Sequence, residues 1–351
     1  MLYHKKNPHG GDHYANPVRL DFSANVNPYG TPKGVIEAVQ EHLSEIWRYP
    51  DPYCRRLVGK IAEFEEVPPE WILCGNGAAE LIYTFCDAAR PRRAVELAPT
   101  FSEYALGLQR VGCVPDRYFL RQENDFAPDG GLISFLEEKK PEAVFLCQPN
   151  NPTGRLIEKS LMQKTLNYCK ENNCMLLLDE CFLDLTDEGE SLKPFLKDFP
   201  QLLILKAFTK SYGMAGIRLG YCLSGNQELL EKMSSAVQPW NVSNLAQAAG
   251  IAALEEKDFL KKTRDLICTE RPWLIAGLKE FGFWVCPSSA NFVLFRGPAD
   301  LYQKLKEQEI AVRSCDNYAG LGTGWYRIAV RQHRENEALV AAVRQCMEDE
   351  K

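Results

Sequence analysis

Lys210 is the residue of this chain whose type and position most clearly suggest chemistry. The apolar run 202–205 predicts a buried strand, and Thr209 and Lys210 follow it closely. Burial disfavours an ammonium ion, which lowers the pKa of a lysine and makes its amine a nucleophile toward carbonyl groups. Arg218 follows a glycine-containing loop, and its planar guanidinium could hold a phosphate in the same pocket. Taken alone, a lysine in this position more often begins a solvated loop.

Asp179 directly follows the apolar run 175–178, which also predicts a buried strand. A carboxylate at such a position needs a partner to remain charged. The partner could be a protonated ring nitrogen, as in enzymes that use pyridoxal phosphate (PLP). Asp179 and Glu180 could instead bind Mg²⁺, but the sequence has no Walker A loop that would supply a nucleotide.

Two turns rich in glycine, asparagine and proline could also contribute to a site. Gly75-Asn76-Gly77 precedes a predicted helix over 78–89, whose free N–H groups and positive dipole end suit a phosphate. Glu80 stands where a dinucleotide fingerprint would have its third glycine, so the turn could equally lack a ligand. Asn151 lies in the turn 148–154, where asparagine is common for backbone reasons, although its amide could donate to a phenolate oxygen.

The elements that position these residues alternate along the chain. Apolar runs that predict buried strands occupy 71–74, 94–97, 143–147, 175–178 and 202–205, and predicted loops and helices separate them. This alternation predicts an α/β fold with a mostly parallel sheet that is covered on both faces. Ligands bind at the carboxyl ends of the strands in such sheets, and the polar motifs fall at those ends.

Three segments are predicted by the distribution of these patterns. Residues 1–30 are polar and rich in Gly, Pro and Asn, and we expect them to form an arm that packs with the smaller domain. Residues 31–243 form the large domain, and 244–351 a small C-terminal domain with strands and helices. A long helix is predicted from Asn244 to about residue 278, with Pro272 bending or dividing it.

Composition excludes several classes of protein. The formal charge of −6, without a basic stripe, argues against nucleic-acid binding. No apolar run approaches the roughly 18 residues that span a bilayer, and no secretory signal is recognisable. Thirteen scattered cysteines without a C-x-x-C pair predict neither a disulfide framework nor a metal site. We therefore expect a cytoplasmic protein that binds no metal, nucleic acid or membrane.

Eight motifs, in this order, resemble the fold-type I PLP-dependent enzymes of the class I and II aminotransferase superfamily. They are Asn-Pro-Tyr-Gly at 27–30, Arg-Tyr-Pro-Asp at 48–51, Gly-Asn-Gly at 75–77, Pro-Thr-Phe-x-x-Tyr at 99–104, Pro-Asn-Asn-Pro-Thr-Gly at 149–154, Asp-Glu at 179–180, Thr-Lys at 209–210 and Gly-x-Arg-x-Gly-Tyr at 216–221. The resemblance implies a large domain with a mostly parallel seven-stranded sheet flanked by helices. It also implies a smaller α+β C-terminal domain.

Within that superfamily the chain resembles the branch of histidinol-phosphate aminotransferases and threonine-phosphate decarboxylases, and finer features favour the decarboxylases of cobalamin biosynthesis. These features are the segments 9–11, 21–25, 239–242, 313–318, 320–321 and 326–331. Phe182 also resembles the decarboxylases, since the aminotransferases usually have tyrosine there. Ala207 departs from the family, which usually has Ser or Thr at this position near the phosphate.

The resemblance implies a role for each site residue. Lys210 would be the Schiff-base lysine, Asp179 the partner of the pyridine nitrogen, and Tyr104 the residue stacked on the cofactor ring. Asn151 would contact the ring oxygen of the cofactor. Its phosphate would be held by the amides of Gly77 and Ala78, by Thr209 and Arg218, and by Tyr49. Because Tyr49 would come from a neighbouring subunit, we expect a homodimer with shared active sites. Arg327 would bind the substrate carboxylate. The substrate phosphate would be bound by His9, Gly10 and Arg313, and further substrate contacts are implied for Asn25 and Asn151.

The implied reaction is PLP-dependent decarboxylation of L-threonine O-3-phosphate to (R)-1-amino-2-propanol O-2-phosphate. One alternative is an aminotransferase that acts on histidinol phosphate and 2-oxoglutarate. Another is a decarboxylase that prefers O-phosphoserine, since one missing methyl group changes discrimination by only about 1–3 kcal/mol. A PLP-binding regulatory module is disfavoured, because no residues remain to form a DNA-binding domain.

Overall fold

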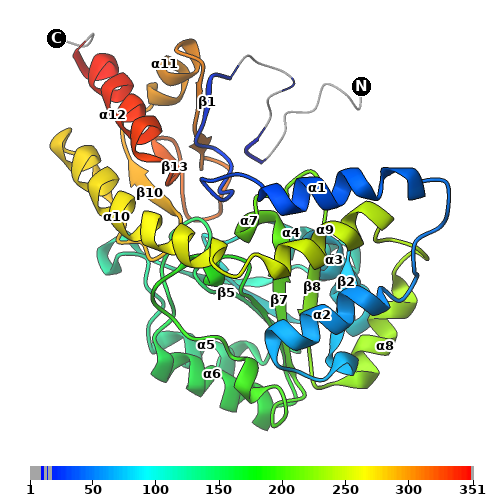
Figure 1. The fold of residues 1–351 in the computed structure, drawn as a ribbon. Helices are drawn as coiled ribbons and strands as arrows, with labels where there is room; N and C mark the ends of the chain where they lie inside the picture. Colours follow the sequence, from blue (N-terminus) through cyan, green and yellow to red (C-terminus); the bar gives the residue numbers. More distant parts are fainter. Residues whose placement is uncertain (1–8, 12–13, 15–17, 349–351) are drawn as a thin grey trace, which may run out of the picture.

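The computed structural model describes residues 9–11, 14 and 18–348, so the parts of the predicted arm at 1–8, 12–13 and 15–17 lie outside the described residues. A seven-stranded sheet forms the centre of the larger part (Figure 1). Its strands, in spatial order, are β2 (Ile72–Gly75), β8 (Gly220–Leu223), β7 (Leu202–Ala207), β6 (Met175–Asp179), β5 (Ala143–Cys147), β3 (Ala94–Ala98) and β4 (Asp116–Phe119). Strand β8 runs in the direction opposite to the other six strands of this sheet. The predicted mostly parallel seven-stranded sheet is confirmed.

The five strands predicted from apolar runs are present close to their predicted bounds, because strands buried on both faces are apolar throughout. The prediction missed β4 and β8. Strand β4 reads Asp-Arg-Tyr-Phe and lies at an edge of the sheet with partly exposed side chains, so it carries no apolar run.

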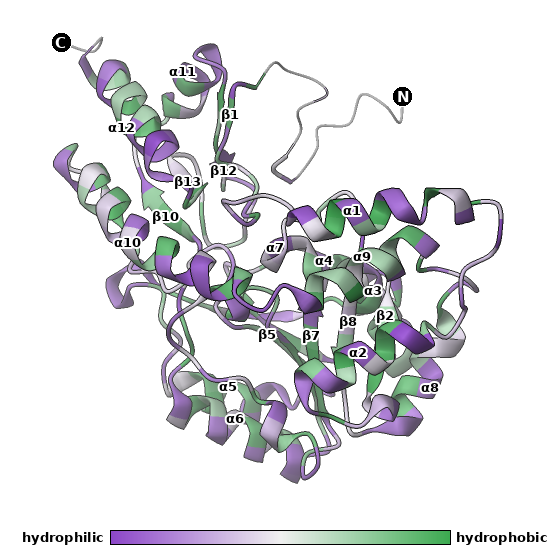
Figure 2. Ribbon diagram, viewed as in Figure 1, coloured by the Kyte–Doolittle hydropathy of each residue, from purple (hydrophilic) through white to green (hydrophobic). Residues whose placement is uncertain are grey.

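Helices cover both faces of this sheet (Figures 1 and 2). One face packs against α3 (Ala78–Ala89), α4 (Glu103–Arg110) and α8 (Gln227–Ala236). The other face packs against α1 (Lys33–Glu41), α2 (Arg55–Glu65), α5 (Gly131–Lys139), α6 (Lys159–Glu171) and α9 (Asn244–Glu255). Alternate residues of each strand enter the two cores. Leu203 and Leu205 of β7 face the α3 side, whereas Leu202 and Ile204 face the α2 side.

A second, four-stranded sheet lies toward the C-terminus. Its strands, in spatial order, are β12 (Arg313–Ser314), β13 (Trp325–Ala329), β10 (Phe292–Arg296) and β9 (Trp284–Val285), and every pair is antiparallel. The helices α10 (Phe259–Glu280), α11 (Leu301–Glu307) and α12 (His333–Glu348) accompany it. A short parallel pair joins β1 (Leu20–Asp21) to β11 (Ile310–Ala311), so this part of the predicted arm (1–30) lies beside the C-terminal part of the chain.

The helix predicted from Asn244 to about residue 278 is two helices, and the prediction that Pro272 divides it is wrong. The break lies between Glu255 and Phe259, and Pro272 is accommodated inside α10. Helix α9 packs against α1 and α2. We therefore propose the connection between α9 and α10 as the domain boundary, later than the boundary at residue 244 predicted above. Among the described helices, none combines the length and apolar character needed to cross a bilayer.

Candidate active site

The carboxyl ends of neighbouring strands bring the predicted chemical groups together. Strand β6 lies between β5 and β7, with Asp179 level with Cys147 on one side and Leu205 on the other. Lys210 lies in the single turn α7 (Phe208–Ser211), directly after β7. Asn151 lies in the turn that follows β5 and is buried. The parallel sheet thus places Lys210, Asp179 and Asn151 together at the carboxyl ends of its central strands.

Lys210 has the environment of a nucleophilic amine. Burial and the positive charges of Arg327 and Arg218 together lower its pKa to about 8, against an opposing effect of Cys181. A pKa close to neutrality leaves much more of the amine unprotonated than in an exposed lysine. The backbone carbonyl of Lys210 accepts a hydrogen bond from the amide of Asn27 at 3.0 Å, which ties the N-terminal segment to the strand end.

Asp179 is buried, and two groups hold its carboxylate. The Tyr104 hydroxyl donates to Oδ2 at 2.7 Å, and the backbone amide of Cys181 donates to Oδ1 at 2.9 Å. Burial raises the pKa of Asp179, while hydrogen bonds from Cys181 and Tyr104 oppose that rise. A buried carboxylate with a raised pKa would gain most from a cationic ring nitrogen.

Tyr104 makes a contact that sequence reasoning missed. The ring is fully buried and lies edge-on to Phe101, and its hydroxyl points at Asp179. No local pattern could show this, because the two residues are 75 positions apart. The predicted stacking of Tyr104 on a cofactor ring stays a prediction, whereas its hydrogen bond with Asp179 is part of the structure.

An anion cup lies at the N-terminus of α3. Gly77 precedes the helix with φ +81°, and a Cβ there would lie 2.5 Å from Nη2 of Arg218. A Cβ at Gly220 would lie 2.6 Å from the amide nitrogen of Ala78. The guanidinium and the free helix amides thus adjoin one another, as phosphate binding requires. Thr209 is half-buried in the turn before Lys210.

Glu80, which sequence reasoning considered only as a missing glycine, holds this cup in shape. Its Oε2 accepts hydrogen bonds from the amide of Asn76 at 2.7 Å and from Nδ2 of Asn241 at 2.6 Å. The same carboxylate therefore fixes the turn before α3 and joins it to the segment after α8.

Two arginines of the C-terminal sheet form a second cationic region. Arg327 and Arg313 are directly opposite one another on β13 and β12, and both are buried. Arg327 donates to Oδ1 of Asn151 at 2.5 Å and to the carbonyl of Ser23 at 2.8 Å, and its Nε has no hydrogen-bond partner among the described residues. Arg313 donates to Oδ1 of Asn317 at 2.7 Å. Like charges opposite one another are unfavourable, so this pair suits an anionic ligand.

Asn25 adds an amide to the same region. It is buried, and neither Oδ1 nor Nδ2 has a partner in the part of the chain that the structure describes. Its backbone carbonyl accepts a hydrogen bond from Nδ2 of Asn291 at 3.2 Å. An unsatisfied buried amide is costly, so both atoms are available to a bound molecule.

His9 and Gly10 contact other groups of this region. His9 Nε2 lies 2.9 Å from Oε1 of Glu103, next to Tyr104, and its ring approaches that of Phe101. Gly10 packs so closely on Ser23 that a Cβ would lie within 2.4 Å of the Ser23 carbonyl oxygen. That carbonyl is also an acceptor for Arg327. Their contact with a substrate phosphate stays a prediction.

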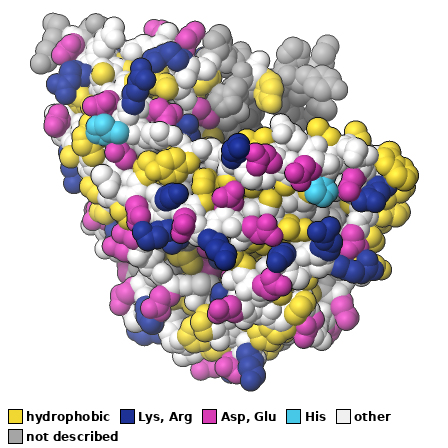
Figure 3. All heavy atoms as spheres, in the orientation of Figure 1, with side chains coloured by type: hydrophobic (Ala, Val, Ile, Leu, Met, Phe, Trp, Pro, Cys, Tyr) yellow, Lys and Arg dark blue, Asp and Glu magenta, His cyan; other side chains and the backbone are white. Residues whose placement is uncertain are grey.

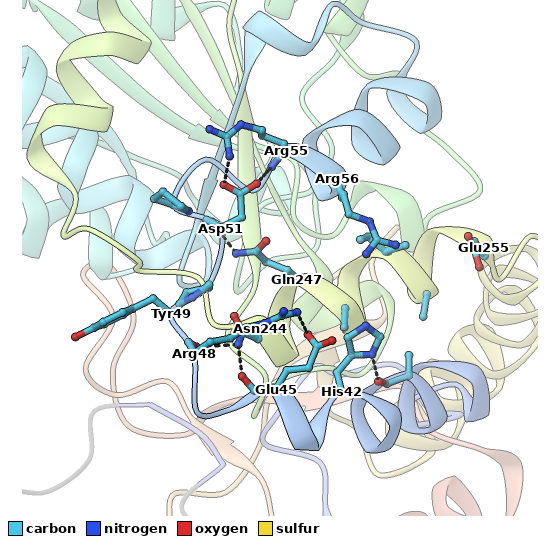
Figure 4. A pocket seen from close by; sticks show the side chains of 16 residues that line it. His42, Glu45, Arg48, Tyr49, Asp51, Arg55, Arg56, Asn244, Gln247 and Glu255 are labelled. Carbon is cyan, nitrogen blue, oxygen red and sulfur yellow. Dashed lines mark hydrogen bonds and ion pairs between the residues drawn. The ribbon is translucent and has the colours of Figure 1, made fainter.

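Tyr49 lies on the surface, 77% exposed and stacked on Trp240 at 4.5 Å between ring centroids. It borders a cleft of about 640 Å³ between α1, α2 and α9, in which Arg48 pairs with Glu45 and Arg55 with Asp51. Figure 4 shows the Tyr49 ring directed away from these ion pairs. Exposed hydrophobic side chains gather at this edge of the molecule (Figure 3).

Comparisons with known proteins agree with this geometry. Residues 18–343 match the family described as aminotransferase class I and II. The chain is 37% identical to threonine-phosphate decarboxylase of Salmonella typhimurium, covering 93% of this chain and 90% of the relative. It is 31% identical to histidinol-phosphate aminotransferase of a Thermoanaerobacter species, covering 94% of each. The solved L-threonine-O-3-phosphate decarboxylase of Porphyromonas gingivalis superposes with a TM-score of 0.85 at 25% identity, covering 94% of this chain and 99% of that one.

Proposed function

The chain belongs to the class I and II aminotransferase family, and we propose that it decarboxylates L-threonine O-3-phosphate. The observation that carries this proposal is the buried pair Arg313 and Arg327, close enough to Lys210 for the charge of Arg327 to lower its pKa. Arg313 adds a second cation directly opposite Arg327, and the two together match a small substrate that carries both a carboxylate and a phosphate. The 37% identity to threonine-phosphate decarboxylase supports the same substrate.

The cofactor of this family is PLP, and the residues of the site fit its functional groups. The cup formed by Gly77, Ala78 and Arg218 would hold the phosphate, together with Thr209. Asp179 would bind the ring nitrogen, and Lys210 would hold the carbonyl carbon. Asn151 would approach the ring oxygen. When bound, PLP withdraws electrons from a bond at the α-carbon of the substrate.

The protein's own groups would then decide which bond breaks. We propose that Arg327 would bind the substrate carboxylate and orient it so that the bond between the α-carbon and that carboxylate is the one that breaks, and CO₂ leaves. Arg313, His9 and Gly10 would hold the substrate phosphate. The Lys210 amine would carry the proton that replaces CO₂ on the α-carbon.

We also propose a homodimer in which Tyr49 reaches the cofactor phosphate of the partner subunit. The support is the exposure of Tyr49 beside other exposed aromatic side chains, among them Trp47 at 82%. Large aromatic surfaces of this kind usually mark an interface. The cytoplasmic location expected from the sequence stays a prediction.

Histidinol-phosphate aminotransferase activity is the second candidate, because such enzymes are also close relatives. Phe182 favours the decarboxylase. It is buried against Phe292, and a hydroxyl at this position would enter an apolar contact with ring centroids 5.0 Å apart.

The deciding experiment supplies the PLP-loaded protein with L-threonine O-3-phosphate and no 2-oxo acid, and measures CO₂ and amine. We expect sustained, equimolar release of CO₂ and 1-amino-2-propanol phosphate. Turnover that requires 2-oxoglutarate and consumes histidinol phosphate would reject the proposal in favour of the aminotransferase. O-phosphoserine, tested in parallel, measures the contribution of the substrate methyl group.

A further inference from the structure

A buried set of charged residues lies behind Asp179, on the opposite face of the sheet. Successive strand residues point to opposite faces, so Asp179 faces the side of Tyr104 and Glu180 faces the side of α2. Glu180 is fully buried, and Lys206 of β7 and Glu65 of α2 are nearly so. Neither Glu180 nor Lys206 has a role in the reaction described above.

Lys206 is the centre of this set. Its Nζ lies 2.8 Å from Oδ1 of Asp184 and 3.4 Å from Oε1 of Glu65. Burial lowers the pKa of Lys206, but the negative charges of Asp184, Glu65 and Glu180 outweigh it, so the pKa is higher than in an exposed lysine. The ammonium ion is therefore a fixed structural charge.

Glu180 closes the loop 180–192 on itself. Its Oε2 accepts a hydrogen bond from the Ser191 hydroxyl at 2.7 Å, and its Oε1 accepts one from the amide of Leu192 at 2.9 Å. Asp184, which Lys206 holds, lies within the same loop. The loop is thus fastened at its two ends by Glu180 and near its middle by Lys206.

The loop also reaches the substrate arginine. Phe182 packs edge-on against Phe292 with ring centroids 5.0 Å apart, and the guanidinium of Arg327 lies over the Phe292 ring at 5.6 Å. Farther along the loop, Arg264 donates to the Asp184 carbonyl at 3.0 Å and Ser289 donates to Glu188 at 2.9 Å. The backbone leads from Glu180 to Phe182 two positions later, and ring contacts then run from Phe182 through Phe292 to Arg327.

We propose that Glu180 is a positioning residue that, by closing the loop 180–192, holds Phe182 in place and, through Phe182 and Phe292, the guanidinium of Arg327. This inference rests on the proposed function, in which Arg327 orients the substrate carboxylate. A loosened loop lets Arg327 turn, so the α-carbon–hydrogen bond competes with loss of CO₂. In that competing step the α-hydrogen leaves as a proton to an exchangeable group, and a deuteron from D₂O returns to the same carbon without redox change.

The test uses Glu180→Gln and Ser191→Ala, which weaken the closure but leave Lys206 and Asp184 in place. Glu96→Gln is the matched control, because Glu96 is a buried carboxylate of the same sheet paired with Arg117 at 2.8 Å. Hydrogen–deuterium exchange of cofactor-free protein reports the loop directly. We expect exchange within 180–192 to become roughly tenfold faster in both variants, as loss of a buried hydrogen bond allows, and to stay unchanged in the control.

Reaction in D₂O supplies the second measurement, the ratio of deuterium found at the α-carbon of the remaining substrate to CO₂ released, because the amine product gains one deuteron with every CO₂ lost in any case. We expect it to rise by about tenfold or more in Glu180→Gln and less in Ser191→Ala, because small misplacements of a reacting group have large kinetic effects. An unchanged ratio despite a loosened loop would assign Glu180 a purely structural role, and an unchanged loop would overturn the inference outright. Absence of CO₂ from the wild type would reject the proposed function alone, since the loop exchange needs no turnover.

Discussion

Two lysines four positions apart show how the same side chain acquires opposite properties at one end of this sheet. Lys206 lies on the α2 face among Asp184, Glu65 and Glu180, and these carboxylates raise its pKa. Lys210 lies at the strand end beside Arg327 and Arg218, and burial together with these cations lowers its pKa to about 8. Loss of solvation opposes the charged form of both lysines, so the sign of the neighbouring charges makes the difference.

The comparison separates a structural cation from a reactive amine. Lys206 is held permanently charged and contributes to the packing of a loop against the sheet. The ammonium form of Lys210 is unfavourable at its position, because its neighbours do not offset the charge. The unprotonated amine that results is the form that reacts with a carbonyl group. The large-domain sheet thus has a stabilising lysine on its α2 face and a reactive lysine at the carboxyl end of β7.

The largest expected effect comes from removing the reactive amine. Lys210→Met should abolish the visible absorbance of lysine-bound PLP and lower CO₂ release by at least about a thousandfold, as loss of a catalytic nucleophile commonly does. Spectrophotometry and the CO₂ assay give both results. The exposed Lys197→Met serves as control and should keep the absorbance and activity. Absorbance that persists in Lys210→Met would contradict the assignment of this lysine.

A second prediction concerns the free energy of unfolding of the cofactor-free protein, in which the two lysines should have opposite effects. The pKa of Lys210 is about 8 when folded and 10.5 as an ordinary lysine, so the unfolded state binds more protons between these values. Below pH 8 the charged Lys210 therefore destabilises the fold, and Lys210→Met should be more stable by about 3 kcal/mol, at about 1.4 kcal/mol for each pKa unit. This advantage should shrink as the pH rises from 8 to 10.5.

Lys206→Met should lose about 3–5 kcal/mol at neutral pH, because it leaves buried carboxylates without their cation. Denaturant unfolding at several pH values measures both variants. An advantage of Lys210→Met that did not depend on pH would show that Lys210 is not buried as an amine of lowered pKa. Equal loss of stability in both variants would remove the distinction between the two lysines.

The sequence sufficed for features that depend on local pattern. Apolar runs predicted the central strands, and the rule that ligands bind at strand ends brought Lys210, Asp179 and Asn151 together. Lys206 escaped notice because it directly follows the apolar run 202–205, and its partners come from α2 and the loop after β6. Only the fold shows that a charge at this position has three carboxylates around it.

Features that depend on register or on long separations could not be predicted. The pairing of Arg313 with Arg327 requires the alignment of β12 with β13. The contact of His9 with Glu103 joins the N-terminal segment to a helix of the large domain. The helix break before α10 was assigned to Pro272, because proline is a strong local signal, whereas the chain breaks where α9 ends its contacts with α1 and α2.

The smallest effect concerns the contact between Tyr104 and Asp179. Tyr104→Phe removes a hydrogen bond that opposes the rise in the pKa of Asp179, so this pKa should rise further. Because the reaction requires the carboxylate form, the acidic limb of the pH profile of kcat/KM should move upward by about one pH unit, since one unit corresponds to about 1.4 kcal/mol. Activity at pH 8 should fall only a few-fold.

Tyr83→Phe is the matched control, because Tyr83 donates to Glu103 at 2.8 Å and not to Asp179. An acidic limb that moves equally in both variants would mean that the hydroxyl of Tyr104 does not act through Asp179. The reactivity at this end of the sheet would then depend on Lys210 and the neighbouring arginines alone.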